Sequence, residues 1–201
     1  MPDVFVTFEG IDGSGKTTQA QLLAERLRVE GGEVVLTREP GGTELGEAIR
    51  SLVLHGGHVA PWAEAALYAA ARAQHVEEVI RPALERGATV VSDRSLDSSV
   101  VYQGVGRGLG LERVLELNLT VVGGLLPDRT VLLRLEPGVA AARMGGELDR
   151  IEREGEAFLE RVHEAYDSLA DRYRDRYVVV DAARPSSELA EEIHGALRSS
   201  S

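Results

Sequence analysis

One eight-residue segment restricts how this chain can fold more than any other part of it. Residues 10–17 read GIDGSGKT, with glycine at the first and sixth positions followed by lysine and threonine. A short apolar run at 4–8 precedes the segment, and a helical pattern at 16–29 follows it. A glycine-rich turn between a strand and a helix can curl successive N–H groups around one anion. The sequence therefore predicts a strand–loop–helix unit that holds a chain of phosphates.

The only lysine of the chain lies in this loop. Lys16 stands alone among 22 basic residues, and the others are arginines. Its ammonium would supply a point charge for the β- and γ-phosphates, and the helix N-terminus would add its dipole. The Thr17 hydroxyl is placed to ligate Mg²⁺. We expect the phosphates of ATP to contact Gly10, Ile11, Asp12, Gly13, Ser14, Gly15, Lys16, Thr17 and Thr18.

Short apolar runs alternate with helical patterns along the chain. The expected strands are at 4–8, 34–37, 89–93, 130–135 and 178–180. The expected helices are at 16–29, 44–54, 61–86, 112–122, 139–144, 154–174 and 186–198. This alternation predicts an α/β protein with a parallel sheet covered on both faces, in one domain over 1–201. We place Trp62 in the core.

Composition excludes several classes of protein. The 201 residues are 43% hydrophobic, enough for one sizeable core, and lack the run of about 18 apolar residues that a membrane span needs. The absence of cysteine excludes disulfides, thiol catalysis and zinc–thiolate sites. A net charge of −11 argues against nucleic acid as a partner. The first ten residues lack a signal-peptide pattern, so we expect a cytoplasmic location.

The loop motif occurs in several kinds of nucleotide-binding protein. The chain lacks the NKxD sequence that reads guanine, which argues against a GTPase switch. Asp93 and Arg94 follow the third strand, where a typical ATPase motor has an acidic pair. A small kinase is therefore the favoured class.

Three arginine-bearing segments fall where an acceptor pocket would form, at the carboxyl ends of parallel strands or facing them. They are 38–42, 68–75 and 93–99. The guanidinium fork suits a phosphate or a flat base edge. Tyr68 lies four residues before Arg72, on the same helical face. On spacing alone, Arg72 can equally be a solvated surface residue, 38–42 a plain turn and 93–95 a strand-end ion pair.

Six segments in order resemble the bacterial thymidylate kinases. They are FEGIDGSGKTT at 8–18, TREPGGT at 37–43, YAAARAQ at 68–74, SDRS at 92–95, SSVVYQG at 98–104 and GELDRIE at 146–152. The resemblance implies transfer of the ATP γ-phosphate to dTMP, giving dTDP and ADP for dTTP biosynthesis, with Mg²⁺. It also implies a nucleoside monophosphate kinase fold: a five-stranded parallel sheet flanked by helices, with a mobile lid at about 139–154. A homodimer is implied as well.

The same resemblance assigns residues to dTMP. They are Asp12, Arg38, Glu39, Arg50, Tyr68, Arg72, Arg94, Ser99, Tyr102 and Gln103. Arg72 should read the thymine edge while Tyr68 stacks on the base. Ser99 and Gln103 should add polar contacts near the base. Tyr102 should lie under the sugar, where it would crowd a ribose 2′-hydroxyl.

The remaining assignments concern the phosphate of dTMP and its 3′-hydroxyl. Arg38 and Arg94 should hold the phosphate, with Arg50 close by. Asp12 should face the 3′-hydroxyl, and Glu39 should lie near it.

The resemblance also implies ligands for Mg²⁺, and the chain departs from the family pattern at two positions. Thr17 should bind Mg²⁺ directly, and Glu39 and Asp93 should bind it through water. Tyr68 stands where relatives often have phenylalanine, so its hydroxyl needs a partner. Ser95 stands where an aromatic residue or histidine is common.

The catalytic set is Asp12, Lys16, Arg94 and Arg150. Residues 11–14 inside the loop contain no arginine, although some relatives carry one there. We therefore predict that the segment 143–153 supplies the cation that the transition state needs. Arg150 is expected to contact the transferring phosphoryl group. Arg143 is the alternative, or else stacks on adenine, and a plain solvated loop is the competing interpretation.

Two other functions stay open at this point. One is a kinase for a different nucleoside monophosphate or for a deoxynucleoside. The other is an ATP-dependent binding switch without an acceptor, which would hydrolyse ATP slowly and would not respond to any monophosphate.

Overall fold

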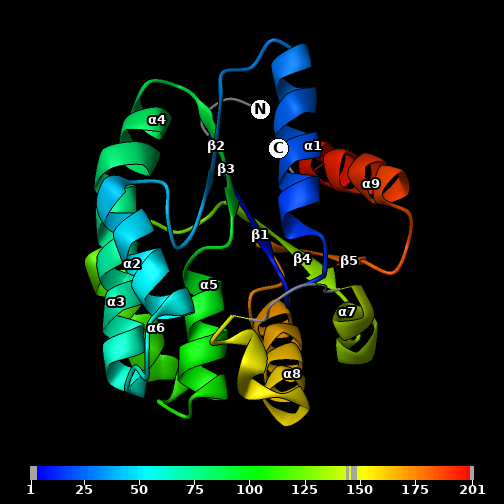
Figure 1. Ribbon diagram of the computed structural model, residues 1–201. Helices are drawn as coiled ribbons and strands as arrows, with labels where there is room; N and C mark the ends of the chain where they lie inside the picture. The colour runs from blue at the N-terminus through cyan, green and yellow to red at the C-terminus, as the bar shows by residue number, and fades with distance from the viewer. Residues whose placement is uncertain (1–3, 144, 146–148, 200–201) are drawn as a thin grey trace.

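A parallel five-stranded sheet forms the centre of the molecule (Figure 1). The computed structural model describes residues 4–143, 145 and 149–199. The strands are β1 (Phe5–Glu9), β2 (Val34–Arg38), β3 (Thr89–Asp93), β4 (Arg129–Arg134) and β5 (Tyr177–Asp181). Their order across the sheet is β2-β3-β1-β4-β5. The predicted α/β class and five-stranded parallel sheet are confirmed.

The middle strand places the glycine-rich loop. All five residues of β1 are buried, as expected of a strand covered on both faces. It pairs with β3 on one side and β4 on the other, with Phe8 opposite Asp93. Since parallel strands end at the same edge of a sheet, the loop after Glu9 and the segment after Asp93 begin side by side.

Helices pack on both sides of the sheet (Figure 1). They are α1 (Lys16–Val29), α2 (Glu44–His55), α3 (Pro61–His75), α4 (Arg81–Glu85), α5 (Leu96–Ser99), α6 (Leu111–Val121), α7 (Pro137–Arg143), α8 (Glu156–Arg172) and α9 (Ser186–Ser199). α1 packs against α9 and β1–β3, whereas α8 packs against β4 and β5. Among the described residues, no helix has the length and apolar character that crossing a membrane requires.

The structure differs from the predicted single helix at 61–86. A π-helical segment, Val76–Ile80, separates α3 from α4. Pro82 lies just beyond it and has no N–H to donate, and its ring would clash with the carbonyl four residues earlier. The wider π turn accommodates that break without ending the helical path.

A second helical stretch was not predicted. α5 leads into a π-helical segment, Val100–Gly106. Serines and β-branched residues here have low helix propensity, so the stretch depends on packing against α6 and α8.

The prediction that Trp62 lies in the core is wrong. Trp62 is 40% exposed in the first turn of α3, with the Arg113 guanidinium 4.7 Å from its ring centroid. Its apolar ring is covered by an arginine instead of the core.

Candidate functional site

The glycine-rich loop wraps around the lysine side chain. Gly10 must be glycine, because a Cβ there would lie 2.6 Å from the Leu133 carbonyl oxygen. Gly15 has φ 93° where α1 begins, a backbone conformation that L side chains rarely adopt. The Lys16 ammonium donates to the Ile11 carbonyl at 2.8 Å and lies 3.5 Å from Asp12 Oδ1. Burial, together with the Arg94 charge, lowers the pKa of Lys16.

A hydroxyl and a carboxylate meet beside the loop. Thr17 Oγ1 donates to Asp93 Oδ2 at 2.5 Å, joining the first turn of α1 to the end of β3. Both groups are hard oxygen ligands of the kind that Mg²⁺ prefers. Glu39, expected to share this role, has both oxygens occupied: Oε2 accepts from Arg72 Nε at 2.6 Å, and Oε1 lies 2.9 Å from His75 Nδ1.

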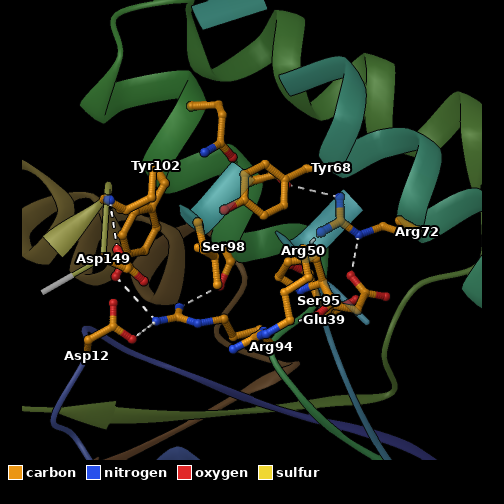
Figure 2. Close-up of a pocket in the computed structure, with 15 residues that line it drawn as sticks. Asp12, Glu39, Arg50, Tyr68, Arg72, Arg94, Ser95, Ser98, Tyr102 and Asp149 are labelled. Atoms are coloured by element: carbon orange, nitrogen blue, oxygen red, sulfur yellow. Dashed lines mark hydrogen bonds and ion pairs between the residues drawn. The ribbon is translucent and has the colours of Figure 1, made fainter. Parts of the chain in front are cut away.

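A cavity opens on the other side of Arg94 (Figure 2). Its walls are Asp12, Glu39, Pro40, Arg50, Leu54, Tyr68, Arg72, Arg94, Ser95, Ser98, Ser99, Tyr102, Gln103, Asp149 and Ile151. Nine of the ten residues assigned to dTMP from the sequence therefore line one space. The exception is Arg38, which is 54% exposed, pairs with Glu47 at 3.0 Å and faces the loop side.

Arg72 is the most enclosed charge in this cavity wall. It is 2% exposed, which contradicts the alternative of a solvated surface arginine. Besides the bond to Glu39, it donates to Ser99 Oγ at 3.1 Å, to the Ser95 carbonyl at 3.1 Å and to Asn118 Oδ1. Burial opposes ionisation of Glu39, but Arg72 and His75 outweigh it and lower the pKa of that carboxyl. These bonds hold the guanidinium in one orientation.

Two aromatic hydroxyls face the same space. Tyr68 projects from α3 beside Arg72, and Tyr102 lies across the cavity near Arg94 (Figure 2). Burial raises the pKa of both phenols far above the ordinary value, so both rings stay neutral. The Tyr102 ring lies 5.1 Å below the Arg94 guanidinium. Gln103, which also lines the cavity, donates to Glu64 at 2.9 Å.

Arg94 joins the loop to the cavity. Its Nη2 donates to Asp12 Oδ1 at 2.6 Å, and its Nη1 donates to the Gly10 carbonyl at 3.1 Å and to Ser98 Oγ at 2.9 Å. Burial disfavours the Asp12 carboxylate, but Arg94 and Lys16 together lower its pKa well below the usual range. Asp12 therefore stays ionised between two cations.

A second cavity lies along the loop. It is lined by Asp12, Gly13, Gly15, Lys16, Thr17, Thr18, Ala20, Gln21, Val35, Leu36, Thr37, Arg38, Glu39, Gly42, Glu47, Arg50, Val79, Asp93, Arg94 and Arg143. Four residues line both cavities: Asp12, Glu39, Arg50 and Arg94. Two ligands in these cavities would meet at that shared wall.

The two arginines expected from the lid lie in different places. Arg143, at the end of α7, lines the loop cavity and donates to the Ala182 carbonyl after β5 at 2.9 Å. Arg150 Nε donates to the Val53 carbonyl at 2.7 Å, and its Nη2 lies 2.6 Å from Glu64 Oε2. Residues 144 and 146–148 of the GELDRIE segment, and the Glu152 side chain, lie outside the described residues.

The sequence reading missed a buried group beneath Arg94. Glu9 is fully buried at the end of β1 and bonds to Ser95, Ser98 and Tyr166. Burial, reinforced by the charge of Asp97, raises its pKa to about 7. A carboxylate at the end of a strand with no other charged residue was the available signal, since such a charge needs partners.

Comparisons with known proteins agree with one another. The sequence model of the family "Thymidylate kinase" matches residues 8–193. The thymidylate kinase of Clavibacter michiganensis subsp. michiganensis is 55% identical over 197 residues, covering 96% of this chain and 93% of that protein. That of Leifsonia xyli is 55% identical with the same coverage. The crystal structure of thymidylate kinase from Ehrlichia chaffeensis superposes with a TM-score of 0.84 at 32% identity, covering 98% of this chain and 100% of that one.

The raised pKa of Glu9 predicts a pH-dependent stability. Between about pH 4.5 and 7 the folded protein keeps this proton while the unfolded chain releases it, so stability falls as pH rises through that window. Urea unfolding at several pH values should show wild type losing stability relative to Glu9→Gln across this range. Thr7→Val removes a buried hydroxyl from the same strand but keeps Glu9. The stability difference between wild type and this variant should therefore stay constant across the pH range. A constant difference between wild type and Glu9→Gln would contradict the assignment.

Proposed function

Because the chain belongs to the thymidylate kinase family, it phosphorylates dTMP to dTDP with ATP, and we propose that the two cavities meeting at Arg94 hold these nucleotides. The observation that carries the proposal is their shared wall. Lys16 lies on the loop side of it, and the buried Arg72 lies on the other. ATP would occupy the loop cavity and dTMP the opposite one.

The base of dTMP would bind at the inner end of its cavity. The fixed guanidinium of Arg72 supports an edge-on hydrogen bond, since its orientation is set before the ligand arrives. Tyr68 offers a ring for stacking on the base. Ser99 and Gln103 line the same region and would add polar contacts. Tyr102 would lie against the sugar and leave little room for a 2′-hydroxyl.

Transfer requires two anions to approach each other. The acceptor is itself a phosphate, so positioning and charge neutralisation matter more than a strong general base. Arg94 and Arg50 line both cavities and would hold the dTMP phosphate at the junction, while Lys16 holds the donor. Arg38 would join them from the loop side, and Asp12 would face the 3′-hydroxyl.

The residues beside the loop fit Mg²⁺. Thr17 Oγ1 would ligate the ion directly, and Asp93 would hold one of its waters, consistent with their contact. Glu39 would act through water, although its carboxylate already pairs with Arg72. When bound, the ion would neutralise charge on the β- and γ-phosphates.

A coupled assay of ADP release tests the proposal. We expect turnover with dTMP well above that with dGMP, AMP, CMP or thymidine, because Arg72 and Tyr68 suit the thymine edge and face and Arg94 needs a phosphate. Turnover with dUMP, which differs from dTMP only by the 5-methyl group, is measured alongside. Chelation of Mg²⁺ by EDTA should abolish turnover. Slow ATP hydrolysis that no monophosphate stimulates would instead support a binding switch.

We propose that the segment at about 139–154 closes over ATP as a lid and carries Arg150 to the transferring phosphoryl group. The Arg150–Glu64 ion pair must then break. Glu64 would stay compensated, because Arg107 Nε lies 3.1 Å from its Oε1. Arg143, already beside the loop cavity, would contact adenine or the phosphates.

Two arginine variants distinguish these roles. Arg150→Ala should lower kcat by about 10²-fold or more with little change in KM for dTMP, because a transition-state contact is lost. Arg143→Ala should mainly raise KM for ATP. Steady-state kinetics with each substrate varied would measure both effects. An unchanged kcat in Arg150→Ala would eliminate this role, and a large fall in Arg143→Ala would transfer it there.

We also propose a homodimer, supported by exposed apolar side chains on neighbouring helices. Leu45 and Leu52 on α2 and Trp62 on α3 are all at least 40% exposed, and α2 contacts α3. Sedimentation should give about twice the chain mass of 21.7 kDa. Leu52→Glu should shift the protein toward monomer, whereas Leu126→Glu, at another exposed leucine, should not. A monomer in wild type would overturn the proposal.

The cytoplasmic location stays a prediction.

A further inference from the structure

The carboxylate of Glu9 shares two hydroxyl partners, Ser98 and Tyr166, with Arg94, and the proposed function gives it no role. Glu9 is the last residue of β1 and is fully buried. Three donors converge on it. The Ser95 amide donates to Oε1 at 2.8 Å, and the hydroxyls of Ser98 and Tyr166 donate to Oε2 at 2.5 and 2.8 Å. A charge in the interior needs such donors, and here they offset part of the burial, which still raises the pKa of Glu9 to about 7.

The first effect of these bonds is on the backbone of Arg94. Its φ of 71° is the only positive value at a non-glycine residue in the part of the chain that the structure describes. A non-glycine residue persists in this region only where neighbouring contacts hold it. Here consecutive amides are anchored to the end of β1: Arg94 N–H donates to the Phe8 carbonyl at 2.9 Å, and Ser95 N–H donates to Glu9.

The second effect is on the guanidinium. Ser98 has one hydroxyl hydrogen, and an ionised Glu9, which can only accept, takes it in the 2.5 Å contact. The Ser98 and Tyr166 hydroxyl oxygens also lie 3.0 Å apart, and this shorter Glu9 contact competes with that one for the hydrogen. The oxygen lone pairs are then free to accept from Arg94 Nη1 at 2.9 Å. The Tyr166 hydroxyl is in the same situation, with its hydrogen on Glu9 and its oxygen 3.4 Å from Arg94 Nη1. A carboxylate that only accepts thus orients two hydroxyls so that both accept from the arginine.

We propose that Glu9 is a positioning residue for phosphate transfer, setting both the backbone and the guanidinium orientation of Arg94 through Ser95, Ser98 and Tyr166. The inference rests on the proposed role of Arg94 as a ligand of the dTMP phosphate. Glu9 itself contacts neither nucleotide. Without it, the Ser98 and Tyr166 hydrogens can turn toward the guanidinium and repel it. The ion pair with Asp12 at 2.6 Å is then the strongest remaining contact of Arg94, and it draws the side chain toward the loop.

Binding of dTMP compared with thymidine tests this chain of contacts. Thymidine lacks the phosphate, so a defect that acts through Arg94 weakens dTMP and spares thymidine. By calorimetry at pH 8, Glu9→Gln should weaken dTMP about tenfold and thymidine less than twofold, the scale expected when a positioning contact is lost. Thr7→Val, also buried in β1, should leave both affinities unchanged. Equal weakening of both ligands in Glu9→Gln, or no weakening, overturns the inference.

A double-mutant cycle separates this inference from the role of Arg94. Arg94→Ala should lose dTMP affinity selectively, and adding Glu9→Gln should then lower kcat/KM for dTMP by less than about twofold, because the two residues act as one unit. A full further decrease overturns the inference alone. If Arg94→Ala weakens dTMP and thymidine equally, the proposed phosphate role itself fails.

A milder variant covers the case in which Glu9→Gln does not fold. Tyr166→Phe removes one bond to Glu9 and keeps the ring packed near Tyr102, whose centroid is 6.4 Å away. It should weaken dTMP about threefold and leave thymidine unchanged, on the scale of one lost hydrogen bond. Wild-type dTMP affinity in this variant overturns the inference. Thermal unfolding of each variant verifies that the folded state is being compared.

Discussion

The ion pair between Arg94 and Asp12 holds the site together. It joins the glycine-rich loop after β1 to the segment after β3, and its two residues line both of the cavities that we propose for ATP and dTMP. The pair is possible because β1 and β3 are parallel neighbours whose carboxyl ends coincide. One guanidinium at this junction therefore faces both cavities.

The candidate site places enclosed cations in a protein whose overall charge is strongly negative. With a net charge of −11 the chain has no general field that attracts nucleotides. Its positive groups are instead enclosed and paired with carboxylates: Arg72 with Glu39, and Lys16 and Arg94 with Asp12. Each cation stays oriented because leaving its partner would strand a buried charge. In the proposed function, this arrangement would hold two phosphates close together with cations whose orientation is fixed in advance.

Part of the fold and of the candidate site could be predicted from the sequence, and part could not. The strands and the loop at 10–17 follow local rules, and a family resemblance named most of the residues that line the cavity beside Arg94. The π-helical segments at Val76–Ile80 and Val100–Gly106 do not, because packing and Pro82 override local propensity there. Trp62 was placed in the core by residue type alone, yet the direction in which a first-turn side chain points decides its exposure.

The chain's order of residues was enough to specify the phosphate loop, the parallel sheet and the family, since each depends on contiguous motifs and on periodicity. Contacts between distant segments belonged to the folded molecule only. Glu9 and Tyr166 are 157 positions apart, and nothing near either one indicates the other. Arg150 likewise follows a family motif, but its pairing with Glu64 depends on how the segment after α7 folds against α3. Hydrogen bonds and ion pairs act over a few ångströms in space, and only the tertiary structure determines which residues come that close.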